Sequence, residues 1–133
     1  MGDRANIVIK QDGSDDRVYF YTHWHGTELP EMLHAALKRG EERWSDNPYL
    51  ARVIFCEMTK GNPMALTGFG ISTSLCDNEY PIIVVDTATE TVSFEPEPDH
   101  AADRPIYARK FTFKEFVGLT DLSWDALDKA QAA

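Results

Sequence analysis

The sequence predicts an α+β fold in which a mostly antiparallel sheet carries two main helices on one face and a short helix at the C-terminus. The chain begins with two runs that alternate apolar and polar residues, the pattern of strands with one buried face. Two segments of helical periodicity follow, then several short β-branched runs and a last helical segment. Strands grouped before and after helices are typical of α+β proteins. The length of 133 residues fits one domain, residues 1–133.

The first two strands are predicted at residues 5–10 and from Arg17 onward, joined by a short Gly/Asp segment as a β-hairpin. A helix is expected after Gly26, with Pro30 in its first turn, where a missing N–H has no cost. His34 lies away from the apolar stripe of this helix, so we expect it to be exposed. The stripe consists of Leu29, Met32, Leu33, Ala36 and Leu37.

A second helix is predicted over about residues 48–60. Its residues are apolar nearly all round, so we expect the whole helix, Cys56 included, to be buried. Glu57 falls on the same side as Leu50, Val53, Ile54 and Met58. A carboxylate there needs a partner or a path to water. We expect low exposure of Glu57 and a partner, with Arg4 or His23 as the candidates.

Further strands are predicted at residues 67–73, 82–85 and 91–94. The run 82–85 is apolar throughout, which predicts a central strand covered on both faces. Residues 95–105 are polar and proline-rich and are expected to form a mobile surface loop. A last strand is expected at residues 106–111.

The C-terminal part carries two helix-start signals. Thr112 and Glu115 have the spacing of a capping box, flanked by Phe111 and Phe116 as a hydrophobic staple. Ser123 is expected to cap the final helix.

Composition excludes several classes of partner. With a net charge of −9 and no lysine/arginine cluster, neither nucleic acid nor an anionic membrane is expected as a partner. The acidity would suit an inhibitor of a basic protein, although acidic soluble proteins are common. The sequence has no apolar run long enough to span a membrane and no leader segment. We therefore do not expect the chain to span or cross a membrane. Cys56 and Cys76 match no disulfide or zinc pattern, so reduced thiols in a cytoplasmic protein are expected.

The segment Tyr-Phe-Tyr-Thr-His-Trp-His-Gly is the most informative part of the chain. If the strand continues through it, side chains alternate between faces, and Tyr19, Tyr21, His23 and His25 line one face. A core strand does not need so many hydrogen-bonding and titratable groups. Aromatic residues with polar tips are efficient contact residues. We therefore predict a site for a small molecule or a protein partner here, with Glu57 as a further candidate.

The same residues allow a metal site. His23 and His25 could hold one zinc ion if a third donor and an open position for water were present. Donors available by residue type are Glu57, Asp3, Asp86 and His34. The chain lacks the stronger metal-hydrolase motifs such as His-Glu-x-x-His. Alternatively, one histidine orients the turn at Gly26 and the other is exposed, and no cofactor is then required.

Other catalytic patterns are absent from the sequence. There is no Gly-x-Ser-x-Gly, and Gly68-Phe69-Gly70 lacks the third glycine of a phosphate-binding loop, because Thr73 stands there. Whether the chain is an enzyme stays open at this point, with a non-catalytic role favoured.

Three segments carry a resemblance: Met1-Gly2-Asp3-Arg4-Ala5-Asn6, Tyr21-Thr22-His23-Trp24 and Gly68-Phe69-Gly70-Ile71-Ser72-Thr73. They resemble a group of short uncharacterised proteins of bacteria and their phages, over residues 1 to about 95. The resemblance implies a small cytoplasmic protein in a bacterial or phage context. It supplies no activity, cofactor or catalytic residue.

The leading hypothesis from the sequence is a small cytoplasmic, non-catalytic binding protein that presents the Tyr/His face to a ligand or protein partner. The alternatives are a metal-dependent hydrolase with a His-x-His ligand pair and an acidic inhibitor of a basic partner. The sequence does not set an oligomeric state.

Overall fold

The computed structural model describes residues 2–11, 14–96 and 110–132. Its strands are β1 (Ala5–Lys10), β2 (Arg17–Thr22), β3 (Phe69–Ser72), β4 (Ile82–Asp86), β5 (Thr91–Glu95) and β6 (Phe111–Thr112). Its helices are α1 (Leu29–Arg39), the short 3-10 helix η1 (Glu41–Arg43), α2 (Asn47–Met58), α3 (Phe113–Val117) and α4 (Trp124–Ala132). These elements confirm the predicted α+β class.

All six strands form one sheet in the order β3-β2-β1-β4-β5-β6. The β1–β4 pair is parallel and every other pair is antiparallel. The predicted hairpin is confirmed, with Ile7 of β1 opposite Phe20 of β2. On its other side, Ile7 lies opposite Ile83 of β4. The first strand of the chain is therefore central in the sheet.

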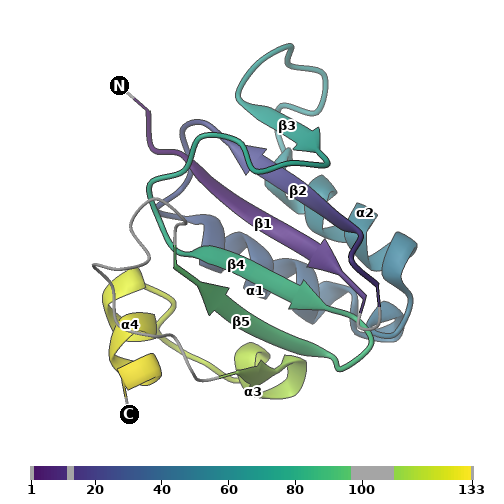
Figure 1. The fold of residues 1–133 in the computed structure, drawn as a ribbon, viewed down its shortest axis with the longest axis vertical. Helices are drawn as coiled ribbons and strands as arrows, with labels where there is room; N and C mark the ends of the chain where they lie inside the picture. Colours follow the sequence, from purple (N-terminus) through teal and green to yellow (C-terminus); the bar gives the residue numbers. More distant parts are fainter. Residues whose placement is uncertain (1, 12–13, 97–109, 133) are drawn as a thin grey trace.

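In the part of the chain that the structure describes, the two main helices cover one face of the sheet. Figure 1 shows α1 and α2 behind the sheet, while the connection from β3 to β4 crosses in front of β2 and β1. The main core lies between the sheet and the helices. A smaller apolar cluster of Val8, Ile82 and Val84 lies on the opposite face, with Tyr19 and Leu75 packed against it. Every residue of β4 is buried, which confirms the prediction of a strand covered on both faces.

The prediction that the second helix is buried all round was wrong. Leu50, Ile54 and Met58 of α2 are buried, whereas Tyr49 and Cys56 are exposed. The helix packs against α1 and β1 on one side. No described element covers its other side, so apolar residues there face the solvent.

The expectation that His34 is exposed was also wrong. Its side chain is half-buried, and its Nε2 donates a hydrogen bond to the carbonyl oxygen of Val117, 2.7 Å away. The short helix α3 packs against α1 and covers this position. Helical periodicity alone did not show that cover, because α3 lies about eighty residues further along the chain.

The helix-start signals near the C-terminus are confirmed. Thr112 accepts a hydrogen bond from the backbone N–H of Glu115, whose side chain accepts one from the N–H of Thr112. The rings of Phe111 and Phe116 are 6.2 Å apart. Ser123 accepts a hydrogen bond from the third following residue at the start of α4.

The loop predicted at residues 95–105 was placed one residue early, because Glu95 is the last residue of β5. Residues 97–105 of that loop and residues 106–109 of the strand predicted at 106–111 lie outside the described residues. Within the described ranges, no helix is long and apolar enough to cross a membrane.

Candidate functional site

The strand β2 ends at Thr22, and the backbone turns at His23 and Trp24 instead of continuing to His25. Two backbone hydrogen bonds fix the turn. The N–H of His23 donates to the carbonyl oxygen of Gly68 at 2.9 Å, and the N–H of Asp3 donates to the carbonyl oxygen of His23 at 2.7 Å. The prediction of one alternating face through residue 25 was therefore wrong beyond Thr22.

Tyr21 and His23 are the two predicted site residues that the structure brings together. The hydroxyl of Tyr21 lies 2.8 Å from Nδ1 of His23. Partial burial, and then the negative charge of Asp77, raise the pKa of Tyr21. The phenol is thus neutral at physiological pH, and its hydroxyl can donate a hydrogen bond to Nδ1. Gly2 packs beside this ring, because a Cβ on Gly2 would lie 3.1 Å from Nε2.

Trp24 is the exposed member of this turn. Its side chain is 52% exposed, and its ring meets that of His23 edge-on at 4.8 Å between centroids. The indole lies against Gly68, where a Cβ would come within 2.9 Å of Cζ3. Gly68 also has a φ of +97°, a conformation that favours glycine. We call Tyr21, His23 and Trp24 the aromatic corner.

The face predicted from the sequence contained Tyr19, Tyr21, His23 and His25, and alternation along a strand placed Trp24 opposite them, so the indole was not predicted as a site residue. Gly68 was the residue that could have pointed to the indole. A glycine in a strand often marks a place where another group comes close, and the backbone of Gly68 is left-handed.

The other predicted site residues lie elsewhere. Tyr19 shares the face of Tyr21, but it packs against the apolar cluster on that face and is half-buried. His25 stacks on Phe69 with 5.7 Å between ring centroids and 4° between planes. Phe69 packs against the main core, on the helix side of the sheet. The two histidines therefore point into different surroundings.

Glu57 has low exposure and ion-pair partners, as predicted, but the partners are other residues. Its side chain is 12% exposed and forms ion pairs with Arg39 at 3.3 Å and with Lys60 at 3.6 Å. The proposed partners were wrong: Arg4 forms ion pairs with Asp77 and Glu79, and His23 contacts Tyr21. Glu57 ties α2 to α1 and is not part of the aromatic corner.

The described residues contain no group of three histidine, cysteine, aspartate or glutamate side chains that could hold a metal ion. The remaining donors suggested by the sequence have other partners. Asp86 accepts hydrogen bonds from the N–H groups of Ala88 and Thr89 in the turn after β4. His34 bonds to α3, as described above. The geometry therefore lends no support to a His23–His25 zinc site.

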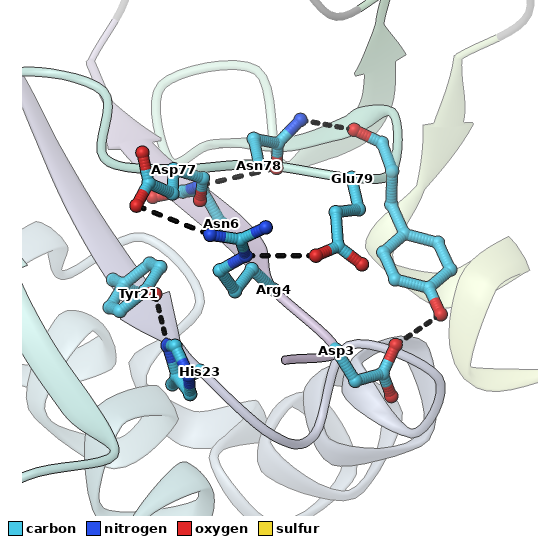
Figure 2. A network of polar contacts seen from close by, with 9 residues as sticks. Asp3, Arg4, Asn6, Tyr21, His23, Asp77, Asn78 and Glu79 are labelled. Atoms are coloured by element: carbon cyan, nitrogen blue, oxygen red, sulfur yellow. Dashed lines mark hydrogen bonds and ion pairs between the residues drawn. The ribbon is translucent and has the colours of Figure 1, made fainter. Parts of the chain in front are cut away.

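A polar network joins the start of β1 to the connection between β3 and β4 (Figure 2). Nε of Arg4 donates to Glu79 at 2.8 Å, and a second nitrogen of Arg4 lies 3.5 Å from Asp77. Nδ2 of the buried Asn6 donates to the carbonyl oxygen of Asp77 at 3.1 Å and to Oδ1 of Asn78 at 3.2 Å. These bonds hold the connection across the face that bears Tyr21.

Asp3 anchors the other side of the turn. Its carboxylate accepts hydrogen bonds from the Tyr80 hydroxyl and from the N–H and hydroxyl of Thr27, at 2.9 and 2.8 Å. Partial burial alone would raise the pKa of Asp3, but the bonds from Tyr80 and Thr27 bring it below its ordinary value. The ring of Tyr80 stacks on that of Trp124 at 5.0 Å. No local sequence signal predicted this anchor, because its members are far apart in the chain.

Comparison of the chain with family models, curated proteins and solved structures gives no match. The resemblance to short bacterial and phage proteins stays a prediction.

Proposed function

We propose that this chain is a small, non-catalytic binding protein that presents the aromatic corner to a protein partner. The observation that carries the proposal is that Trp24 is half exposed although its surroundings are fixed. His23 beside it is held by Gly68, Asp3 and Tyr21. One part of the indole packs against Gly68 and His23, and the exposed part is available to a partner.

The energetics suit recognition. At 52% exposure, the indole offers roughly 100 Å² to a partner, equivalent to about 2.5 kcal/mol at the usual coefficient for apolar area. A fixed ring loses little conformational entropy on binding, so more of that free energy appears as affinity. The imidazole of His23 and the phenol of Tyr21 lie beside the ring and can make hydrogen bonds at the rim of the interface. This combination is typical of binding hot spots.

Binding is favoured over catalysis because the polar groups of the corner pair with one another. The Tyr21 hydroxyl engages Nδ1 of His23, and His25, the nearest other base in sequence, stacks on Phe69. Both cysteines are free thiols, which suits the reducing cytoplasm, where we place the protein as part of this proposal.

The test is selection of peptides from a display library on the purified chain, followed by affinity measurement. Tyr49 is the matched control, because its ring is 55% exposed on α2, away from the corner. Trp24→Ser is expected to weaken the selected peptides at least tenfold, and Tyr49→Ser to leave them unchanged. Selection of no peptide, or binding by Trp24→Ser equal to that of the wild type, would refute the proposal. If the selected peptides are instead basic and their affinity depends mainly on the salt concentration, the acidic-inhibitor alternative would be favoured.

A further inference from the structure

The edge strand β3 is short, but it carries none of the side chains that usually prevent edge pairing. It lies at one end of the strand order, and its outer edge pairs with no strand in the described part of the chain. Natural edge strands are commonly protected by lysines, prolines or bulges. The sequence of β3 is Phe-Gly-Ile-Ser, with no charge and no proline. Ile71 at its centre is 61% exposed.

The region around β3 is neutral in a strongly charged chain. The sixteen residues 61–76 contain no aspartate, glutamate, lysine, arginine or histidine, while the whole chain has 35 acidic and basic residues and a net charge of −9. Two copies of such a chain repel each other over most surfaces. The neutral segment at this edge adds no like charges to that repulsion.

Exposed apolar side chains gather at the same margin. Six large apolar residues are exposed among those the structure describes; Tyr49 lies on α2 and Trp24 belongs to the aromatic corner. The other four, Val18, Met64, Leu66 and Ile71, lie in or beside the β2–β3 edge. Met64 and Leu66 are 88% and 99% exposed, in the loop that projects beyond β3 in Figure 1. Gathered apolar exposure of this kind marks an interaction surface.

The strand pattern of β3 fits a second β3. Phe69 and Ile71 face the helix side, because they pair with Thr22 and Phe20, whereas Gly70 faces the other side. Residues opposite each other in antiparallel strands share a face. A two-fold axis perpendicular to the sheet therefore sets Ile71 of one copy opposite Ile71 or Phe69 of the other.

A groove beside this edge gives room for the added side chains. It has a volume of about 470 Å³ and lies between α2 and strands β2 and β3, with Phe20, Phe55 and Ile71 among its lining residues. We propose that two copies of this chain associate through antiparallel pairing of their β3 edges, forming one continuous sheet. This pairing goes beyond the proposed function and does not depend on it. It places both helix layers on one side and both aromatic corners on the other.

Sedimentation equilibrium over a range of concentrations tests this pairing. The wild type is expected to approach twice the 15.0 kDa mass of the chain as concentration rises. Ile71→Lys, which places two like charges at the axis, is expected to stay at the monomer mass. Tyr49→Lys is the control, an equally exposed apolar residue on α2, and is expected to associate like the wild type. Circular dichroism checks that each variant is folded.

Hydrogen exchange provides a second measurement that needs no substitution. Amide protection in β3 is expected to rise with protein concentration, while protection in β6 stays constant. A wild type that remains monomeric at the highest concentration reached would overturn the proposal, and β3 would then be open to a strand from another protein. Association retained in Ile71→Lys would also overturn it, because the interface would lie elsewhere. Trp24→Ser is expected to associate normally, so failure of the peptide test and failure of this one are distinguishable.

Discussion

Gly68→Ala tests whether the aromatic corner is held by the contact between Trp24 and the backbone of residue 68. Two effects are expected. Alanine at a φ of +97° has backbone strain of about 1–2 kcal/mol. In addition, the new Cβ would lie 2.9 Å from Cζ3 of Trp24, so the indole must move. Because the ring is half exposed, it can swing into solvent, and the added loss is limited to its packing, about 1 kcal/mol.

Gly61→Ala is the matched control. Gly61 has a φ of +92°, nearly the same backbone conformation, but a Cβ there would meet no atom within 4 Å. Urea denaturation should therefore show Gly68→Ala as less stable than Gly61→Ala by about 1 kcal/mol. Fluorine NMR of the chain labelled with fluorotryptophan should show a shifted Trp24 resonance in Gly68→Ala alone. Equal stability of the two variants with an unchanged Trp24 resonance would refute the assigned contact.

Three further predictions follow from contacts described above. Glu57→Gln should lower the free energy of unfolding by about 0.5–1 kcal/mol, since both cationic partners are more than half exposed; thermal melts with Glu42→Gln as an unpaired exposed control check this. Asp3, whose pKa is lowered in the fold, stabilises the protein above its unfolded pKa of about 4, and this contribution is lost as pH falls through the folded pKa. Unfolding titrations from pH 6 to about pH 2 should accordingly show a shallower acid loss in Asp3→Asn. Thr112→Ala should remove the capping box and lower stability by about 1 kcal/mol in urea titrations, whereas Thr112→Ser should retain most of it.

The features that the sequence predicted well depend on neighbours in the chain. The hairpin of β1 and β2, the buried stripe of α1 and the capping box at Thr112 each arise from residues a few positions apart. Their periodicity and spacing are therefore visible in the sequence. The low exposure of Glu57 was predictable for the same reason, since helical geometry alone sets its side of α2.

The features that the sequence predicted poorly depend on segments that are distant in the chain. The strand through His25 is interrupted because Gly68 and Asp3 capture the backbone of His23. The partner of Glu57 is Arg39 because α1 lies beside α2, and no periodicity within one helix shows which helix is its neighbour. Trp24 was overlooked because its exposure results from that same interruption.

The central position of β1 sets an order for folding. Ile7 must pair with Ile83, so the sheet cannot be completed until a segment more than seventy residues away is present. Closing so long a stretch of chain is entropically costly, and non-local pairing of this kind slows folding. While the chain emerges from the ribosome, β2, α1, α2 and β3 are made before β4, so the edge of β1 that β4 occupies is the last of its two edges to be paired. Synthesis of β4 thus ends the period in which the nascent chain is most open to aggregation.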